Sequence, residues 1–318
     1  MIDSAAGRGR RADRPSRIPW RGWRDILIRT FENISRTNAT LVAAGVAFFA
    51  FLAIPSAFAA LVALYGLVFN PSDVQHQVEA MRGVVPDQAI GLISNQLQAI
   101  ASHSPTRLGV SFGISFVLLL WSARSGVSSL MTALNIAYEE NEKRGYIAFE
   151  ATALALTAGG LLFAILSLAL IVLLPAAFEL LPLGAFSKTL ASVVRWPVLI
   201  ALIVMSLAAL YRFGPSRERA RFRWLSWGAT VASLVWLMAS ALFSIYVTYF
   251  GSYDKTYGSL GGVVVLLMWL YLSCLAVLVG AEMNAEIEHQ TARDSTTGPP
   301  EPMGKRGAKM ADTLGEPR

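Results

Sequence analysis

The sequence has little charge and only one cysteine. Charged side chains make up 15% of its 318 residues, against about 25% in soluble domains, while apolar side chains make up 54%. This balance argues against an ordinary soluble domain and indicates a membrane protein. The single cysteine, Cys274, excludes an intrachain disulfide and a thiolate metal cluster, and its place in an apolar run suits a small packing side chain.

Residues that build enzyme centres are also scarce. The three histidines are His76, His103 and His289, and the topology derived below places the first two on the opposite side of the membrane from the third. No His-Glu-x-x-His, Walker or Gly-x-Ser-x-Gly motif occurs. The acidic run at 139–142 could bind a cation, but a short charged loop at a helix exit is more often solvated. We therefore predict no enzymatic activity, catalytic residue, metal site or cofactor.

Long apolar runs are what the sequence does contain. The run from Gly261 to Gly280 carries no charge and matches the ~20 residues that a helix needs to cross a bilayer. We predict an all-α polytopic integral membrane protein with six transmembrane helices, and a kink at Pro55 in the first of them. The predicted spans are residues 41–69, 108–134, 151–174, 190–211, 224–250 and 261–283.

The segments outside the spans differ in character. Residues 1–19 are basic and lack an apolar period, so we predict a disordered arm before a membrane domain at 20–289. Residues 20–38 carry apolar side chains at helical spacing and several arginines, which predicts an amphipathic helix at the interface. The insert 70–107 predicts two short outer amphipathic helices that either cap a cavity or lie on the bilayer. Residues 290–318 predict a disordered tail.

Basic residues decide the orientation. With six spans, 21 of the 27 lysines and arginines fall on the side of both termini, five fall on the other side, and Arg124 lies within a span. The positive-inside rule therefore predicts a bacterial inner-membrane protein with both termini in the cytoplasm. The rule also accounts for the pI of about 9.6, so we expect no nucleic-acid partner.

Three motifs in the last span carry a family resemblance. They are Gly-Ser-Leu-Gly-Gly at 258–262, Leu-Met-Trp-Leu-Tyr-Leu-Ser at 267–273 and Gly-Ala-Glu-Met-Asn-Ala at 280–285. A second signature, Ala-Leu-Asn-x-Ala-Tyr, occupies 133–138. Together they resemble the YihY/BrkB family of bacterial membrane proteins, some of which were labelled ribonuclease BN or virulence factors. The resemblance implies links to envelope integrity and lipid movement. The family usually has a tyrosine where Phe49 stands, so no role of a hydroxyl group is carried over to that position.

Five polar residues stand in or beside apolar surroundings near the predicted cytoplasmic side. Arg124, Asn135 and Tyr138 share a face at helical spacing, and Glu282 and Asn284 end the last span. A charge within the membrane is costly and usually faces protein or water. We hypothesise that Glu282 pairs with Arg124 and closes a cavity between spans two and six. Two alternatives stay open: Arg124 extends to the headgroups, or the pair is an interhelical clamp with a purely structural role.

A glycine-rich motif precedes the last span on the opposite side. Tyr257, Gly258, Gly261 and Gly262 permit close backbone packing, either as an aromatic belt with a turn or as a substrate gate.

The function that we predict is envelope lipid handling or transport through a polar-lined cavity between helices. The expected partners are membrane lipids and, beyond them, envelope lipid-transfer proteins or a second copy of the chain. A docking subunit of an envelope complex is the alternative, and a membrane-bound ribonuclease is a third reading that the residues do not support.

Overall fold

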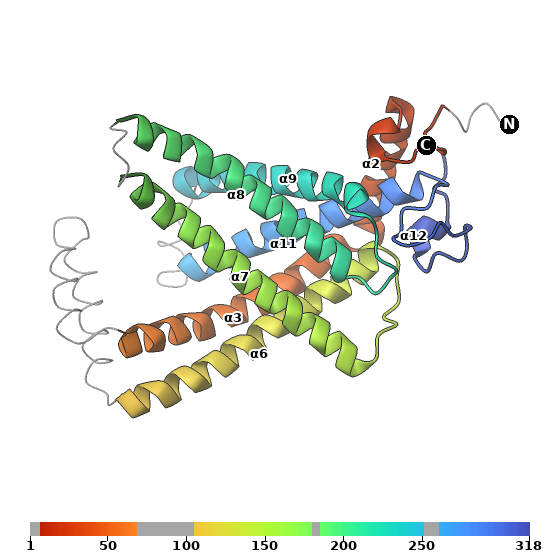
Figure 1. Ribbon diagram of the computed structural model, residues 1–318. Helices are drawn as coiled ribbons and strands as arrows, with labels where there is room; N and C mark the ends of the chain where they lie inside the picture. The colour runs from red at the N-terminus through yellow and green to blue at the C-terminus, as the bar shows by residue number, and fades with distance from the viewer. Residues whose placement is uncertain (1–6, 69–104, 180–184, 251–260) are drawn as a thin grey trace. The chain divides into compact units, whose positions relative to one another are not determined.

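The computed structural model describes residues 7–68, 105–179, 185–250 and 261–318, and in these segments nearly all regular structure is helical. The only bridge outside helices in this part of the chain joins Ala220 to Thr296. The elements, drawn in Figure 1, are η1 (Pro15–Arg17), α2 (Trp20–Arg36), α3 (Ala39–Val68), α6 (Pro105–Ala137), α7 (Tyr146–Glu179), α8 (Ala185–Phe213), α9 (Phe222–Phe250), α11 (Gly261–His289) and α12 (Lys309–Asp312).

The helices confirm the predicted class, an all-α polytopic membrane protein. By length and composition, α6, α7, α8, α9 and α11 can each cross a membrane, and α2 with α3 adds a sixth if that bent pair is one span. The two helices of the pair meet at 64°, so α2 turns away from the direction of α3. The helices α6, α7, α8, α9 and α11 reach or pass both predicted ends of their spans, and α3 begins before residue 41 and is described to Val68. The helix α3 runs through Pro55, and the predicted kink there stays a prediction.

Apolar side chains cover the outside of these helices. Leu162 and Ile165 on α7 are exposed, as are Met238 and Leu242 on α9. Exposed apolar surface of this extent is unusual for a protein in water, but it matches the acyl chains around a spanning helix.

The chain forms two compact units, Phe49–Gly126 and the combination of Met1–Phe48 with Val127–Arg318. In the smaller unit, α3 and α6 lie side by side, because a Cβ on Gly126 would lie 3.5 Å from the backbone nitrogen of Ala50. We refer to the larger unit as the main unit.

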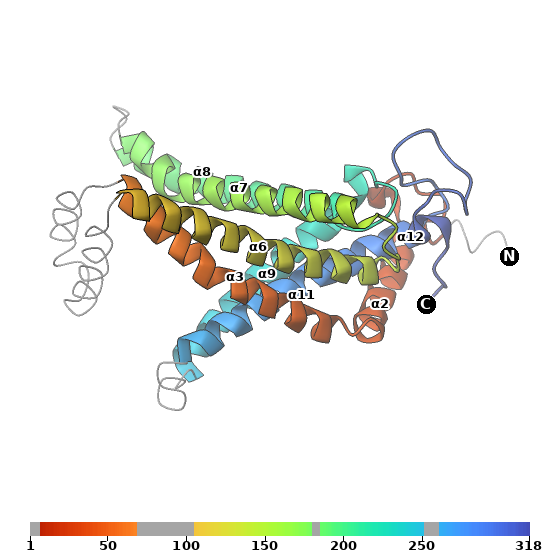
Figure 2. The same ribbon diagram turned by 90° about the horizontal axis from the view of Figure 1, so that it is seen from below.

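In the main unit, α11 packs along α9, α9 along α8, and α8 along α7, as Figures 1 and 2 both show. The helices approach closely because small residues line the contacts, among them Ala43, Ala133, Ala229 and Ala285, all of them buried. Helix α2 packs on the last turns of α11, and α12 packs on the same helix. The end of the main unit formed by α2, α12, the last turns of α11 and the connections 138–145 and 214–221 is called the polar end below.

Residues 7–19 and 290–318, which belong to the segments predicted to be disordered, are joined to each other by hydrogen bonds in this structure. The backbone amide of Ala292 donates to the carbonyl of Arg10 at 2.8 Å, and the hydroxyl of Thr291 donates to the carbonyl of Ala12 at 2.6 Å. The amide of Gly315 donates to the carbonyl of His289 at 2.9 Å. These polar segments fold because each supplies hydrogen-bond partners to the other, a pairing that composition alone does not reveal.

The predicted outer elements lie mostly outside the described residues. This applies to almost all of the insert 70–107 and to Tyr257 and Gly258 of the glycine-rich motif. Of that motif, Gly261 is buried and Gly262 is exposed at the start of α11.

Candidate functional site

The last turns of α11 bury four polar side chains. Glu282, Asn284, Glu286 and Glu288 are each no more than 2% exposed. Their spacing of two residues places Glu282 with Glu286 on one face of the helix and Asn284 with Glu288 on another. Burying three carboxyl groups costs free energy unless each finds a charged or hydrogen-bonding neighbour.

Glu286 finds its neighbours on α2. The Nε of Arg29 donates to one carboxylate oxygen at 2.5 Å, and the amide of Asn33 donates to the other at 2.6 Å. Arg29 also donates to the side-chain oxygen of Gln290 at 2.7 Å. Both charged side chains are almost fully buried. This ion pair therefore fixes α2 across the end of α11.

Glu288 finds its partner on the connection between α8 and α9. The guanidinium of Arg217 donates to its two oxygens at 2.6 and 3.2 Å, and the hydroxyl of Ser295 donates to one of them at 2.7 Å. The same guanidinium lies 4.2 Å from the ring centroid of Tyr138. Burial raises the pKa of the Tyr138 phenol well above its usual value, so the ring stays neutral beneath the cation.

Asn284 joins α11 to α9. Its side-chain oxygen accepts from the backbone amide of Gly228 at 2.8 Å, and its side-chain nitrogen donates to the carbonyl of Leu225 at 3.1 Å. A Cβ on Gly228 would overlap both this amide and the carbonyl oxygen of Gly280. The contact therefore requires glycine at that position, and Asn284 joins α11 to the backbone of α9.

Asn135 joins two connections at the polar end. Its side-chain oxygen accepts from the backbone amide of Ser216 at 2.7 Å, and its nitrogen donates to Glu142 at 3.0 Å. The guanidinium of Arg144 binds Glu142 and donates to the carbonyl of Gly214 at 2.9 Å. Hydrogen bonds from Arg144 lower the pKa of Glu142 to about 2. The connections 138–145 and 214–221 are thereby held together.

Glu282 is less completely paired. One oxygen accepts from the hydroxyl of Thr37 at 2.9 Å, and the other is buried without a hydrogen-bond partner in the described residues. Arg124 lies on the α6 segment of the smaller unit, with its guanidinium 5.2 Å from the ring centroid of Trp121. The structure thus brings Asn135, Tyr138 and Asn284 to the polar end with Glu282, while the predicted pairing of Glu282 with Arg124 stays a prediction.

A second feature is an apolar cavity between the helices of the main unit. It has a volume of about 430 Å³ and is formed by α6, α7, α8, α9 and α11. Polar groups are few, and Ser273 already accepts from the indole nitrogen of Trp236 at 2.9 Å. The apolar part of the lining includes Leu130, Leu156, Phe163, Ile203, Leu207 and Val277.

The lining differs from the polar-lined cavity that the sequence predicted. None of Asn135, Tyr138, Glu282 and Asn284 is among the described residues that line this cavity. Their side chains are used in contacts between helices and connections at the polar end instead, where buried polar groups need partners. Arg29 and Arg217 were not among the predicted site residues, although three acids near one helix end imply cationic neighbours.

Known proteins that are similar to this chain identify its family. The family model described as Virulence factor BrkB matches residues 30–304. The putative ribonuclease-like protein YfkH of Bacillus subtilis is 34% identical over 184 residues, 55% of this chain and 64% of that protein. The UPF0761 membrane protein IL2447 of Idiomarina loihiensis is 30% identical over 188 residues, 58% of this chain and 61% of that protein.

These two matches span a little over three fifths of each relative's length. A UPF0761 membrane protein of Pseudoalteromonas atlantica matches over 89% of this chain and 96% of its own length, at 25% identity. No solved structure matches. Because the family model covers most of the chain, the protein belongs to the Virulence factor BrkB family of membrane proteins.

Proposed function

We propose that this protein handles membrane lipid by accepting an acyl chain into the cavity between α6, α7, α8, α9 and α11. The observation that carries the proposal is the cavity itself. Its volume of about 430 Å³ falls in the range of about 300–1,000 Å³ typical of ligand pockets. It lies among helices long enough to cross a membrane, where lipid is the surrounding solvent.

The lining favours an acyl chain over a polar solute. A polar substrate needs hydrogen-bond partners to replace its water, and the cavity offers few. Gly159 and Gly160 of α7 are both exposed, and a Cβ added at either would meet no atom within 4 Å. An opening at these glycines would let a chain enter sideways from the bilayer. In this proposal the protein sits in the bacterial inner membrane, with the polar end and both termini in the cytoplasm.

A matched pair of variants tests the proposal. Gly160→Leu adds a side chain at a residue that lines the cavity, whereas Gly45→Leu adds the same side chain at an exposed site of α3 that also has open space. Each variant is reconstituted with a photoactivatable phospholipid, and labelled residues are mapped by mass spectrometry. Lipid-scrambling rates are measured in the same liposomes.

We expect wild type and Gly45→Leu to be labelled on cavity residues and to share one scrambling rate. Gly160→Leu should lose most of the labelling, with a lower rate if the bound lipid is moved. Equal labelling of the two variants would exclude the cavity as a lipid site.

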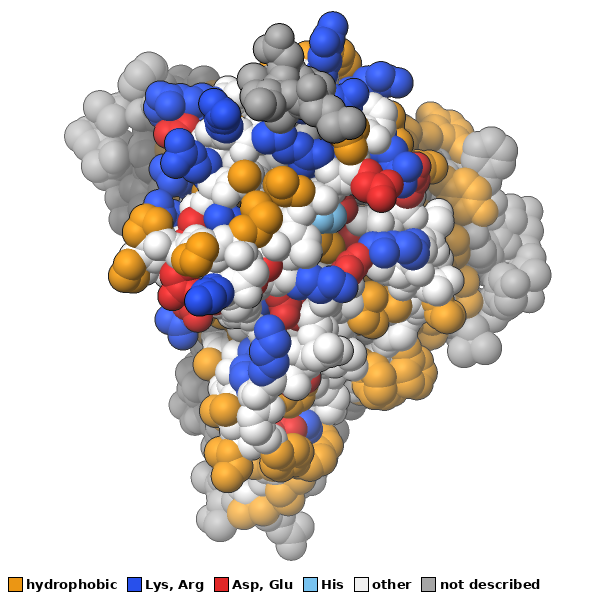
Figure 3. Space-filling view, turned by 90° about the vertical axis from the view of Figure 1, so that its right-hand side faces the viewer, with side chains coloured by type: hydrophobic (Ala, Val, Ile, Leu, Met, Phe, Trp, Pro, Cys, Tyr) orange, Lys and Arg blue, Asp and Glu red, His pale blue; other side chains and the backbone are white. Residues whose placement is uncertain are grey.

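A docking role is a second candidate. The folded arm and tail give the polar end a fixed surface outside the spans, as docking requires, and Figure 3 shows lysine and arginine mixed with acidic side chains there. Ribonuclease activity, suggested by the printed name of YfkH, is not part of the proposal. The acids that could serve it, Glu139 and Glu140, already bind basic neighbours such as Lys309 and Lys143.

A further inference from the structure

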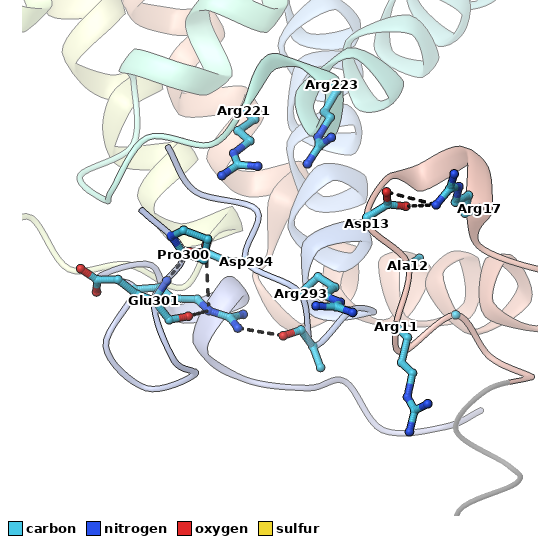
Figure 4. A pocket seen from close by; sticks show the side chains of 13 residues that line it. Arg11, Ala12, Asp13, Arg17, Arg221, Arg223, Arg293, Asp294, Pro300 and Glu301 are labelled. Atoms are coloured by element: carbon cyan, nitrogen blue, oxygen red, sulfur yellow. Dashed lines mark hydrogen bonds and ion pairs between the residues drawn. The ribbon is translucent and has the colours of Figure 1, made fainter. Parts of the chain in front are cut away.

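We propose that a pocket lined by arginines at the polar end binds a phosphate ester group. The pocket has a volume of about 740 Å³ and is formed by the arm before α2, the start of α9 and the tail after α11. In Figure 4, Arg221 and Arg223 reach into it from the α9 side, and Arg293 and Arg11 lie across from them. This site is separate from the apolar cavity, so the inference stands or falls independently of the proposed function.

The cations around the pocket are all arginine. Its lining contains six arginines, no lysine and three acidic residues, which leaves an excess of three positive charges. A guanidinium presents a planar fork of donors that matches two oxygens of a phosphate group, whereas a lysine acts as a point charge. The composition of the lining therefore favours a phosphate group over a neutral polar ligand or a cation.

Three of the arginines hold the walls in place. Arg306 donates to the carbonyls of Ala311 at 2.6 Å and Ala292 at 2.8 Å. Arg221 donates to the carbonyl of Thr296 at 2.9 Å. The third, Arg17, is paired with Asp13. These contacts tie the tail to itself, the tail to the start of α9, and the arm to its own helical turn.

The other three arginines are unengaged. Arg11, Arg223 and Arg293 are exposed, and their side chains make no hydrogen bond or ion pair with another residue in the described part of the chain. A single exposed arginine is normally just solvated. Here the three come from three segments that are distant in sequence, and the contacts of the folded arm and tail direct them to one pocket.

The acids of the lining do not neutralise these three. Asp13 is taken by Arg17. Burial acts to raise the pKa of Asp294, but hydrogen bonds from Glu301 and Thr296 outweigh it and lower the pKa, so this carboxylate is charged and already occupied. Glu301 is the remaining acid and is exposed. The net field in the pocket therefore favours an anion.

The phosphate could belong to a soluble phosphate ester or to a phospholipid headgroup, and two probes distinguish these sources. Protein in phosphatidylcholine nanodiscs is titrated with inorganic pyrophosphate, and separately prepared in nanodiscs that contain phosphatidylglycerol. The readout is the unfolding temperature from intrinsic tryptophan fluorescence, because a ligand that binds only the folded state raises it. The double variant Arg223→Gln/Arg293→Gln is compared with Arg21→Gln/Arg24→Gln, which removes the same charge from exposed sites on α2.

We expect wild type and the α2 control to respond alike to at least one probe, and the pocket variant to bind at least about tenfold more weakly. A response to pyrophosphate alone assigns the site to a soluble phosphate ester, and a response to phosphatidylglycerol alone assigns it to a headgroup. If neither probe shifts the wild type, or if both double variants respond equally, the proposal is wrong.

A measurement on the wild-type protein guards against a variant that misfolds. Phenylglyoxal modifies accessible arginines, and mass spectrometry identifies them. The responding probe should protect Arg11, Arg223 and Arg293 while leaving Arg21 and Arg24 reactive. Uniform protection, or none, would overturn the assignment.

Discussion

One helix, α11, passes through two different environments in the main unit. Around Ser273, Ala276 and Val277 it borders the apolar cavity, where few polar contacts constrain its neighbours. Three turns later, Glu286 and Glu288 are buried against arginines from α2 and from the connection before α9. The comparison separates a part of the helix that can make room for a ligand from a part that holds helices in position.

The two regions differ in the kind of contact that their side chains need. Apolar contacts in the cavity region are many, weak and interchangeable, so a void can persist or be filled. At the polar end each buried group needs a specific partner, so any displacement leaves a charge or donor unpaired. We infer that the polar end fixes the helix positions that keep the cavity open.

Removing Arg217 should give the largest effect. Arg217→Ala leaves the Glu288 carboxylate buried and uncompensated, which costs about 3–5 kcal/mol for a buried pair. We expect that loss in the free energy of unfolding, measured by denaturant titration in micelles. The double variant Arg217→Met/Glu288→Met should recover most of it, because no unpaired charge remains. A loss of stability below 1 kcal/mol in the single variant would mean that the pair is not buried as described.

A glycine-to-alanine substitution should have opposite effects on stability in the two regions, at Gly228 (Gly228→Ala) and at Gly160 (Gly160→Ala). A Cβ on Gly228 would overlap Asn284 and the carbonyl of Gly280, and such overpacking costs about 1–3 kcal/mol. Gly160→Ala adds its Cβ in open space within a helix, where alanine is favoured over glycine by roughly 0.5–1 kcal/mol. Unfolding titrations of both variants test the comparison directly, and equal effects of one sign would break it.

The smallest expected effect is the loss of stability at low pH. Hydrogen bonds from Arg144 lower the pKa of Glu142 from 4.5 to about 2. A depressed carboxyl pKa contributes stability that is present above the unfolded value and is lost as pH falls through the folded value. Wild type should therefore lose stability between about pH 4.5 and pH 2, and Glu142→Gln should lose less over the same window. Unfolding temperatures at pH 5 and pH 3 measure this. Parallel profiles of the two proteins would show that Glu142 does not cause the loss.

The sequence predicts the helices well and their partners poorly. Apolar runs with charged ends define spans such as 224–250, and α9 occupies Phe222–Phe250. Such runs can be recognised from the local sequence alone, because each spanning helix must be apolar where it contacts the bilayer. The importance of Asn284 could also be inferred, because an amide at the end of an apolar run needs a partner.

The partners themselves could not be inferred, because they come from distant segments. Arg29 is 257 residues from Glu286 in sequence, and its position on a predicted interfacial helix gave no sign of this partner. The folding of the tail against the arm likewise depends on backbone groups that every sequence has. The cavity depends on how small residues such as Gly160 leave space between helices, a property of packing rather than of any one segment.

The order of the buried ion pairs along the chain bears on how the protein is made. Both cations, Arg29 and Arg217, leave the ribosome before the acids of α11 that they bind. Glu286 and Glu288 are therefore synthesised after the residues that carry their counter-charges. Pairing of these two acids thus needs no cation from a later segment of the chain.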